Sequence, residues 1–225
     1  MAQPLQRGLA SLARAAGEKG LVVVKLGGSV IRSGELAAWL EAIAAARQPI
    51  VVVPGGGALA DEVRSCQAAL GFGDRAAHRM ALLAMDQLAW AVAGLAQGFV
   101  VGTTEAELRA VLARGDVAVW APYGLVAGRD DVEESWRLTS DSLALWLARR
   151  LGAARCFLVK SVPRQGSRAG AEELARTGIV DAAFPAMLKA ADVETFLLGR
   201  GDQKGFAAAL AAGDEGAGGF AAAID

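Results

Sequence analysis

Residues 21–29 are the stretch that most limits how this chain can fold. An apolar run, Leu-Val-Val-Val, is followed by Lys25, Leu26, two glycines and Ser29. Aliphatic and β-branched residues in succession favour a strand that is buried on both faces. Paired glycines then allow a sharp turn that brings backbone N–H groups close to an anion. We interpret the stretch as a phosphate-binding corner to which Lys25 adds a positive charge, with a purely structural turn as the alternative.

A second corner of the same kind lies at residues 49–57, Pro-Ile-Val-Val-Val-Pro-Gly-Gly-Gly. Between the two corners, residues 35–47 place their apolar side chains on one helical face. A strand, a helix and a second strand form a unit whose strands run parallel, so both glycine runs lie at one edge of the sheet. Ligands of open α/β sheets bind at that edge. The pattern predicts an α/β fold with a mainly parallel central sheet, in which residues 27–33 are a connecting loop.

Several classes of protein are disfavoured by composition and motif. Neither corner matches G-x-G-x-x-G or G-x-x-x-x-G-K-S/T, which argues against a dinucleotide-dependent enzyme and an ordinary P-loop NTPase. The formal net charge of the 225 residues is -1, which gives no electrostatic reason to expect nucleic acid. Cys66 and Cys156 suit buried reduced thiols better than a disulfide or a metal site.

No membrane association is expected from the sequence. No stretch approaches the roughly 18 uncharged apolar residues that a membrane span needs. Residues 1–20, which we predict to be a tail or a short helix, lack the continuous apolar core of a secretory signal. We therefore expect a cytoplasmic protein with no membrane partner.

A long helix is predicted over residues 75–96, and it is unusually apolar on all sides. Such helices are buried or lie in subunit interfaces, so we expect a homodimer or a higher homo-oligomer that packs through this helix. His78 lies near its start and Asp86 further along. A lone histidine is more often a structural hydrogen-bonding group than a catalyst, and contact with substrate is more plausible here than base chemistry.

Two further polar features have a bland and a functional interpretation. Arg64 lies one turn into the helix predicted over residues 58–70, where it could reach a phosphate at the glycine corner or simply face water. Residues 128–136 carry several acids that could bind magnesium. A solvated loop is the better interpretation of that segment, because carboxylates in loops usually face water.

Asp141 and Lys160 are the remaining candidates for chemistry. Asp141 lies in Thr-Ser-Asp-Ser at the start of an apolar helix, where Thr139 or Ser140 could cap the helix and Asp141 favour its dipole. Alternatively, Asp141 orients lysines or magnesium around a phosphoryl group. Lys160 ends the strand predicted at residues 155–162, much as Lys25 ends the first, and a buried lysine needs an anion or a carboxylate.

The order of these motifs resembles that of the amino acid kinase family. The motifs are K-L-G-G-S at residues 25–29, V-V-V-P-G-G-G at 51–57 and L-T-S-D-S-L-A-L-W-L-A at 138–148, followed by a strand and a polar loop at 163–170. The resemblance implies a single three-layer αβα sandwich over residues 21–225. It further implies an acceptor-binding half at about 21–125 and a nucleotide-binding half at about 126–212. The glycine-rich end of the chain, 213–225, is expected to be partly disordered.

The same resemblance implies roles for individual residues in a reaction that uses ATP and Mg²⁺. Lys25 would stabilise the transferring phosphoryl group, and Asp141 would organise the catalytic lysines. The residues implied to hold the ATP phosphates are Gly27, Gly28 and Ser29, with the second lysine supplied by Lys160 or by Lys189. Those implied or inferred to bind the phosphorylated acceptor are Gly55, Gly56, Gly57, Arg64, His78 and Asp86.

The chain also departs from the family pattern. The usual T-D-V-D-G is replaced by Lys-Ser-Val-Pro-Arg at residues 160–164, which lacks both acids. Residues 63–64, 77–87 and 178–181 are similar to kinases of the methanofuran pathway, which convert [5-(aminomethyl)furan-3-yl]methyl phosphate to its diphosphate with ATP. The alternatives are a uridylate, isopentenyl phosphate or acyl-amino acid kinase, or a protein that binds nucleotides or oxyanions without catalysis.

Overall fold

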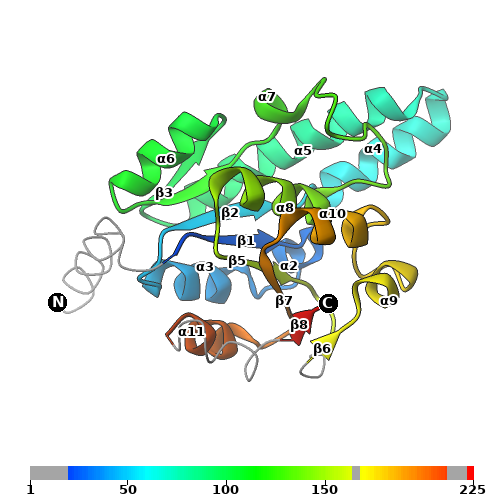
Figure 1. Cartoon of the computed structure of the whole chain (residues 1–225). Coiled ribbons are helices and arrows are strands. Elements are labelled where there is room, and N and C mark those ends of the chain that lie inside the picture. The colour runs from blue at the N-terminus through cyan, green and yellow to red at the C-terminus, as the bar shows by residue number, and fades with distance from the viewer. Residues whose placement is uncertain (1–19, 164–167, 212–221) are drawn as a thin grey trace.

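The computed structural model describes residues 20–163, 168–211 and 222–225. Its centre is one eight-stranded sheet of order β3-β4-β2-β1-β5-β7-β8-β6, in which every pairing is parallel except that of β7 with β8 (Figure 1). Helices cover both faces, so the predicted α/β sandwich with a mainly parallel sheet is confirmed. The expectations for residues 1–19, for residues 164–167 of the polar loop and for residues 213–221 lie outside the described residues.

The strands are β1 (Val22–Leu26), β2 (Ile50–Pro54), β3 (Phe99–Gly102), β4 (Val117–Trp120), β5 (Arg155–Val159), β6 (Arg168–Ala169), β7 (Glu194–Leu198) and β8 (Ala222–Ile224). The helices of the first half are α2 (Gly28–Arg32), α3 (Leu36–Ala45), α4 (Gly57–Leu70), α5 (Asp74–Leu95), α6 (Glu105–Ala113) and α7 (Tyr123–Val126). Those of the second half are α8 (Ser140–Leu151), α9 (Ala171–Arg176), α10 (Phe184–Ala191) and α11 (Gln203–Ala211). No helix in the described part of the chain is both long and apolar enough to cross a membrane.

Alternate residues of each strand point to opposite faces of the sheet. Because helices cover both faces, the side chains on either side are buried. Val23, Val51 and Leu158 belong to the core beneath α6, α8 and α10, whereas Val24 and Val52 belong to the core beneath α3 and α11. Figure 1 shows α3 and α11 on one side of the sheet and α6, α8 and α10 on the other. This double burial explains why the strands read as continuous apolar runs rather than alternating ones.

The strand order brings the predicted chemistry together at one edge. β1 pairs in parallel with β2 on one side and with β5 on the other, so Leu26 is level with Pro54 and with Val159. The residues that follow these strand ends are therefore neighbours. The Gly27 N–H donates to the Val159 carbonyl at 2.9 Å, and the Gly55 N–H donates to the Leu26 carbonyl at 2.8 Å.

The two glycine corners are in direct contact. A Cβ atom built on Gly28 would lie 2.5 Å from the Gly57 Cα and 2.6 Å from its nitrogen. Gly57 itself has a φ of +52°, a left-handed conformation that disfavours other residues. Position 28 needs glycine for a different reason: the backbone of Gly57 lies too close to leave room for a Cβ atom.

Several details differ from the sequence-based expectations. Residues 28–32 form the short helix α2 rather than a loop, because Val30 is buried against the core. α7 was not expected. Neither were β6, which lies within the loop predicted at 163–170, and β8, which pairs with β6 and β7. Cys156 is buried as predicted, but Cys66 is only half-buried, and both are free thiols.

We predict that Gly28→Ala lowers stability by about 1–3 kcal/mol, because the new methyl group must push two backbones apart. Gly94→Ala is the matched control: Gly94 is an exposed residue of α5, where an added Cβ would meet no other atom of the described residues. That change should be neutral or stabilise by about 0.5–1 kcal/mol. Urea unfolding measures both, and equal stability of the two variants would contradict the proposed packing constraint.

Candidate active site

A pocket of about 570 Å³ opens at the edge where β1, β2 and β5 end. Its size is typical of sites for small molecules. The glycine corners supply Gly28, Ser29, Gly55, Gly56 and Gly57 to its walls. The helices α4 and α5 supply Arg64, His78 and Met85, among others, and the segment before and at the start of α8 supplies Trp136, Leu138, Thr139 and Ser140.

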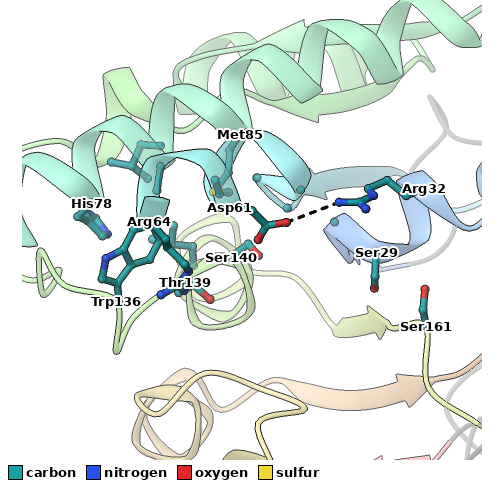
Figure 2. Close-up of a pocket in the computed structure, with 18 of the residues that line it drawn as sticks. Ser29, Arg32, Asp61, Arg64, His78, Met85, Trp136, Thr139, Ser140 and Ser161 are labelled. Carbon is teal, nitrogen blue, oxygen red and sulfur yellow. Dashed lines mark ion pairs between the residues drawn. The ribbon is translucent and has the colours of Figure 1, made fainter. Parts of the chain in front are cut away.

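The pocket has two ends of different character (Figure 2). Ser29 and Ser161 face each other at one end, and His78, Arg64 and Trp136 lie together at the other, with Thr139 and Ser140 between them. Hydroxyls and glycine amides suit phosphate oxygens. Leu82, Leu138 and Leu143 also line the pocket and suit an organic group.

Below the pocket, one carboxylate joins two lysines. The Lys25 ammonium lies 2.7 Å from Oδ1 of Asp141, and the Lys160 ammonium donates to Oδ2 of Asp141 at 2.6 Å. The side chains of Lys25 and Asp141 are about 4 and 5% exposed, and that of Lys160 is 14% exposed. Ser140 and Ser161, the chain neighbours of Asp141 and Lys160, line the pocket. The structure thus brings together the three residues that the sequence assigned to catalysis.

In this cluster, burial disfavours charged side chains, and the attraction between opposite charges favours them. The pKa of Lys25 is lowered to about 8: burial lowers it most, the attraction of Asp141 raises it, and the charge of Lys160 lowers it. For Asp141, burial alone would raise the pKa, but the two lysines hold it at about 2. Asp141 is therefore ionised at neutral pH, and Lys25 is a cation whose charge is only partly compensated.

Asp181 fixes the start of α8, and with it Asp141. Its carboxylate accepts hydrogen bonds from the backbone N–H groups of Thr139 and Ser142 at 2.9 and 3.1 Å, and from both hydroxyls. The expected cap by Thr139 or Ser140 does not form, because Asp181, from the segment before α10, takes that role. Burial and the nearby charge of Asp141 raise the pKa of Asp181.

Three arginines line the pocket. Arg64 was predicted from the sequence, whereas Arg32 and Arg200 were not. Arg32 lies 3.7 Å from Asp61, and both side chains are largely exposed, so the pair contributes little to stability (Figure 2). The charge of Arg32 therefore remains available to an anion in the pocket.

His78 is buried within the pocket wall, with 3% of its surface exposed. Neither ring nitrogen has a hydrogen-bond partner in the described structure. Burial lowers its pKa, so the ring is neutral at pH 7 and has one donor and one acceptor to offer. A buried polar group without a partner is costly, which indicates that a ligand completes its hydrogen bonds.

Six predicted site residues do not line the pocket themselves. Gly27, Asp141 and Lys160 are chain neighbours of residues that do, and Lys25 pairs with Asp141, whereas Lys189 and Asp86 make their contacts elsewhere. Lys189 lies on α10 with 79% of its side chain exposed, 3.6 Å from Glu172. Asp86 points toward α7, where it accepts a hydrogen bond from the Tyr123 N–H at 3.1 Å, and burial raises its pKa. The structure therefore places Lys160, and not Lys189, beside Lys25.

The described residues contain no group of three His, Cys, Asp or Glu side chains that could hold a metal ion. The acids at residues 128–136 are engaged elsewhere: Asp131 accepts from Arg129 and Trp146, and Glu134 pairs with Arg75 and Arg79.

Comparison with known proteins agrees with this geometry. Residues 20–164 match the model of the amino acid kinase family. The [5-(aminomethyl)furan-3-yl]methyl phosphate kinase of Methanocaldococcus jannaschii is 28% identical over 143 residues, which span 62% of this chain and 65% of that protein. The aligned region therefore covers less than two thirds of that relative.

Solved structures share the fold at lower identity. Uridylate kinase from Archaeoglobus fulgidus superposes with a TM-score of 0.68 at 18% identity, covering 91% of this chain and 99% of that one. UMP kinase from Ureaplasma parvum gives 0.67 at 12% identity, with 92 and 97% covered. Aspartate kinase from Synechocystis gives 0.60 at 16% identity, with 80% of this chain and 37% of that one covered.

We predict that substitutions of the two residues in the Lys25–Asp141 ion pair affect stability differently. Asp141→Asn should destabilise by about 3–5 kcal/mol, because it leaves buried lysines without their carboxylate. Lys25→Met should be neutral or stabilising at pH 7, because it removes a cation that burial disfavours. Thermal unfolding of both variants at pH 7 checks this, and a large loss in Lys25→Met would contradict it.

The pH dependence follows from the pKa of Lys25. In the unfolded chain this lysine stays protonated up to about pH 10.5, and in the folded protein up to about pH 8. The folded state thus binds fewer protons between these values, so stability rises with pH. Across this interval the melting temperature of the native protein should rise relative to that of Lys25→Met. A constant difference between the two proteins would refute the lowered pKa.

Proposed function

Because the chain belongs to the amino acid kinase family, we propose that it is an ATP-dependent phosphotransferase whose acceptor is a small phosphorylated molecule. The observation that carries the proposal is the Lys25–Asp141–Lys160 cluster beneath a pocket lined by two glycine corners. Phosphoryl transfer depends on positioning and on neutralising charge, and needs little covalent chemistry from the protein. Lysines and backbone amides supply both.

In this proposal the nucleotide occupies the end of the pocket near Ser29 and Ser161. The amides and hydroxyl of Gly27, Gly28 and Ser29 hold the phosphates of ATP. Lys25 and Lys160 stabilise the charge that develops on the transferring group, and Asp141 keeps the two ammonium groups in place. Mg²⁺ would be held through the ATP phosphates beside Gly27, Gly28 and Ser29, and it would neutralise part of their negative charge.

The acceptor occupies the other end, between Gly55–Gly57 and α5. Its phosphate lies within reach of Arg64 and the glycine amides, and its organic part lies near His78. A phosphate oxygen of the acceptor attacks the γ-phosphorus of ATP, the bond to the ADP oxygen breaks, and a diphosphate and ADP result. A phosphate dianion is already an adequate nucleophile, so the reaction requires no general base.

We propose [5-(aminomethyl)furan-3-yl]methyl phosphate as the acceptor and its diphosphate, in methylofuran biosynthesis, as the product. Support comes from the Methanocaldococcus jannaschii relative, which is named for that substrate. The site is compatible with it: a neutral His78 can accept a hydrogen bond from an ammonium group, and three leucines are among the residues that line the pocket. Uridylate is the nearest alternative, because the uridylate kinases share the fold.

A substrate panel tests the proposal. ADP release is measured with ATP, Mg²⁺ and each of three acceptors: the furan phosphate, uridylate and isopentenyl phosphate. Selective turnover of the furan phosphate would support both the reaction and its place in the pathway. Turnover of uridylate or isopentenyl phosphate alone would support a kinase but would reject the furan phosphate as its acceptor. No turnover, with ATP still bound, would favour a binding protein.

We predict that Lys25→Ala lowers kcat at least about a hundredfold, the typical effect of losing one preorganised charge. Lys160→Ala should have an effect of similar size. Lys189→Ala is the matched control and should leave kcat within twofold, because Lys189 is exposed and lies outside the pocket wall. Full activity of Lys25→Ala, with the fold retained, would remove that residue from the mechanism.

We also propose that the chain forms a homodimer or a higher homo-oligomer through α5. This helix exposes Met80, Leu83, Trp90 and Leu95, with Trp90 66% exposed. Leu83 and Trp90 are seven residues apart and so share a helical face. Large apolar side chains gathered on one exposed face are typical of subunit interfaces.

The double variant Leu83→Glu/Trp90→Glu should therefore be a folded monomer, because charges on this face oppose its burial. Light scattering after size exclusion measures the mass. Leu70→Glu, on the exposed end of α4, serves as the control and should keep the native oligomer. A native protein that is monomeric at micromolar concentration would contradict the proposal.

A further inference from the structure

The segment between α7 and α8 is attached to the helical hairpin of α4 and α5. Glu134 lies 2.7 Å from Nε of Arg79 and 2.9 Å from Nε of Arg75, both on α5. Its Oε1 also accepts a hydrogen bond from the Gly128 N–H at 3.4 Å. These ion pairs hold the segment in place, so the side chains that follow have defined positions.

Trp136, two residues further on, contacts α4 in two ways. Its ring lies over the guanidinium of Arg64, with the Arg64 Cζ 3.6 Å from the ring centroid. Its indole N–H donates to Oε1 of Gln67 at 2.6 Å. Arg64 and Gln67 are three residues apart and therefore lie on one face of α4. The tryptophan spans both.

Gln67 is itself held in place. Its Nε2 donates to Oδ1 of Asp74 at 2.9 Å and to the Phe72 carbonyl at 3.2 Å. With its amide group thus oriented, Oε1 is directed at the indole N–H. The orientation of the Trp136 ring is fixed by this hydrogen bond rather than by packing alone.

The Trp136 ring covers one face of the Arg64 guanidinium, and the edge of the guanidinium is available for hydrogen bonds. Both Arg64 and Trp136 line the pocket, and Figure 2 shows them together at the end that holds His78. Among the described residues, no carboxylate forms an ion pair with Arg64. A guanidinium stacked on an aromatic ring still presents its in-plane N–H groups, which is the geometry that binds phosphate in a bidentate manner.

We infer that Trp136 is a positioning residue for the acceptor phosphate, which acts by holding the Arg64 guanidinium in the pocket through the Arg64–Trp136–Gln67 contacts. The inference rests on the proposed function and deepens it. A free arginine loses rotamer freedom when it binds an anion, and a stacked one has already lost it. Because Trp136 acts on binding and not on the transferring group, its effect falls on the acceptor KM.

A double-mutant cycle tests the inference. Trp136→Leu should raise the acceptor KM about twofold to fivefold, the effect of losing a cation–π contact to an exposed arginine, and leave kcat and the KM for ATP unchanged. Trp136→Phe, which keeps a ring but loses the N–H donor, should have a smaller effect. In an Arg64→Ala background, Trp136→Leu should have no further effect.

The opposite results would overturn the inference. Additive effects in the Arg64→Ala background would show that Trp136 acts independently of Arg64. A fall in kcat in folded Trp136→Phe would place its role in the chemical step. Arg150→Gln is the control: Arg150 also lies over a tryptophan, Trp146 at 4.8 Å, but outside the pocket, and its loss should not change the acceptor KM.

A measurement without substrate separates failure of this inference from failure of the proposed function. The ring current of Trp136 should shift the Arg64 Nε–H proton upfield in a ¹H–¹⁵N spectrum, and the resonance is assigned by its loss in Arg64→Ala. Trp136→Leu should return it to the range of the other arginines. An unshifted resonance in the native protein overturns the inference, whichever acceptor the panel identifies. A shifted resonance would confirm the contact between Arg64 and Trp136. If no acceptor is turned over as well, the proposed kinase function fails and the contact stands.

Discussion

The pairing of Asp141 with two lysines is the interaction on which the site depends. Lys25 comes from the end of β1, Lys160 follows β5, and Asp141 lies in the first turn of α8. Two cations so close and so deeply buried would repel each other and bear the full cost of lost hydration. One carboxylate between them offsets both effects, and it thereby joins the two central strands to a helix that covers them.

The backbone of the glycine corners complements that charge. A Cβ atom on Gly28 would collide with the backbone of Gly57, Gly57 itself has a left-handed backbone, and a Cβ atom on Gly27 would lie 2.9 Å from the Val159 carbonyl oxygen. In the proposed function, these small residues would let a phosphate come near to Lys25. The parallel strand order supplies the rest, because it places the ends of β1, β2 and β5 at one edge of the sheet.

The sequence predicts the parts of this site that have local signals. Apolar runs that end in lysine or glycine predicted β1, β2 and the start of β5, and with them Lys25, Lys160 and the glycine corners. The strand predicted at residues 155–162 ends at Val159, so Lys160 follows the strand rather than belonging to it. Arg200 and Trp136 have no such signal, since an arginine after β7 and a tryptophan in an acidic segment reach the pocket only through tertiary structure. The choice between Lys160 and Lys189 also needed the structure. Their flanking sequences do not say which lysine faces Asp141.

The lowered pKa of Lys25 links stability to ligand binding. Its charge is disfavoured, because burial opposes it more strongly than Asp141 supports it. A polyphosphate placed over Gly28 and Ser29 would bring negative charge close to Lys25 and favour the protonated lysine. The cation that lowers the stability of the folded protein would then be the group that an anionic ligand stabilises. In the proposed function, Lys25 would favour the transferring phosphoryl group most, since their interaction would strengthen as negative charge develops there.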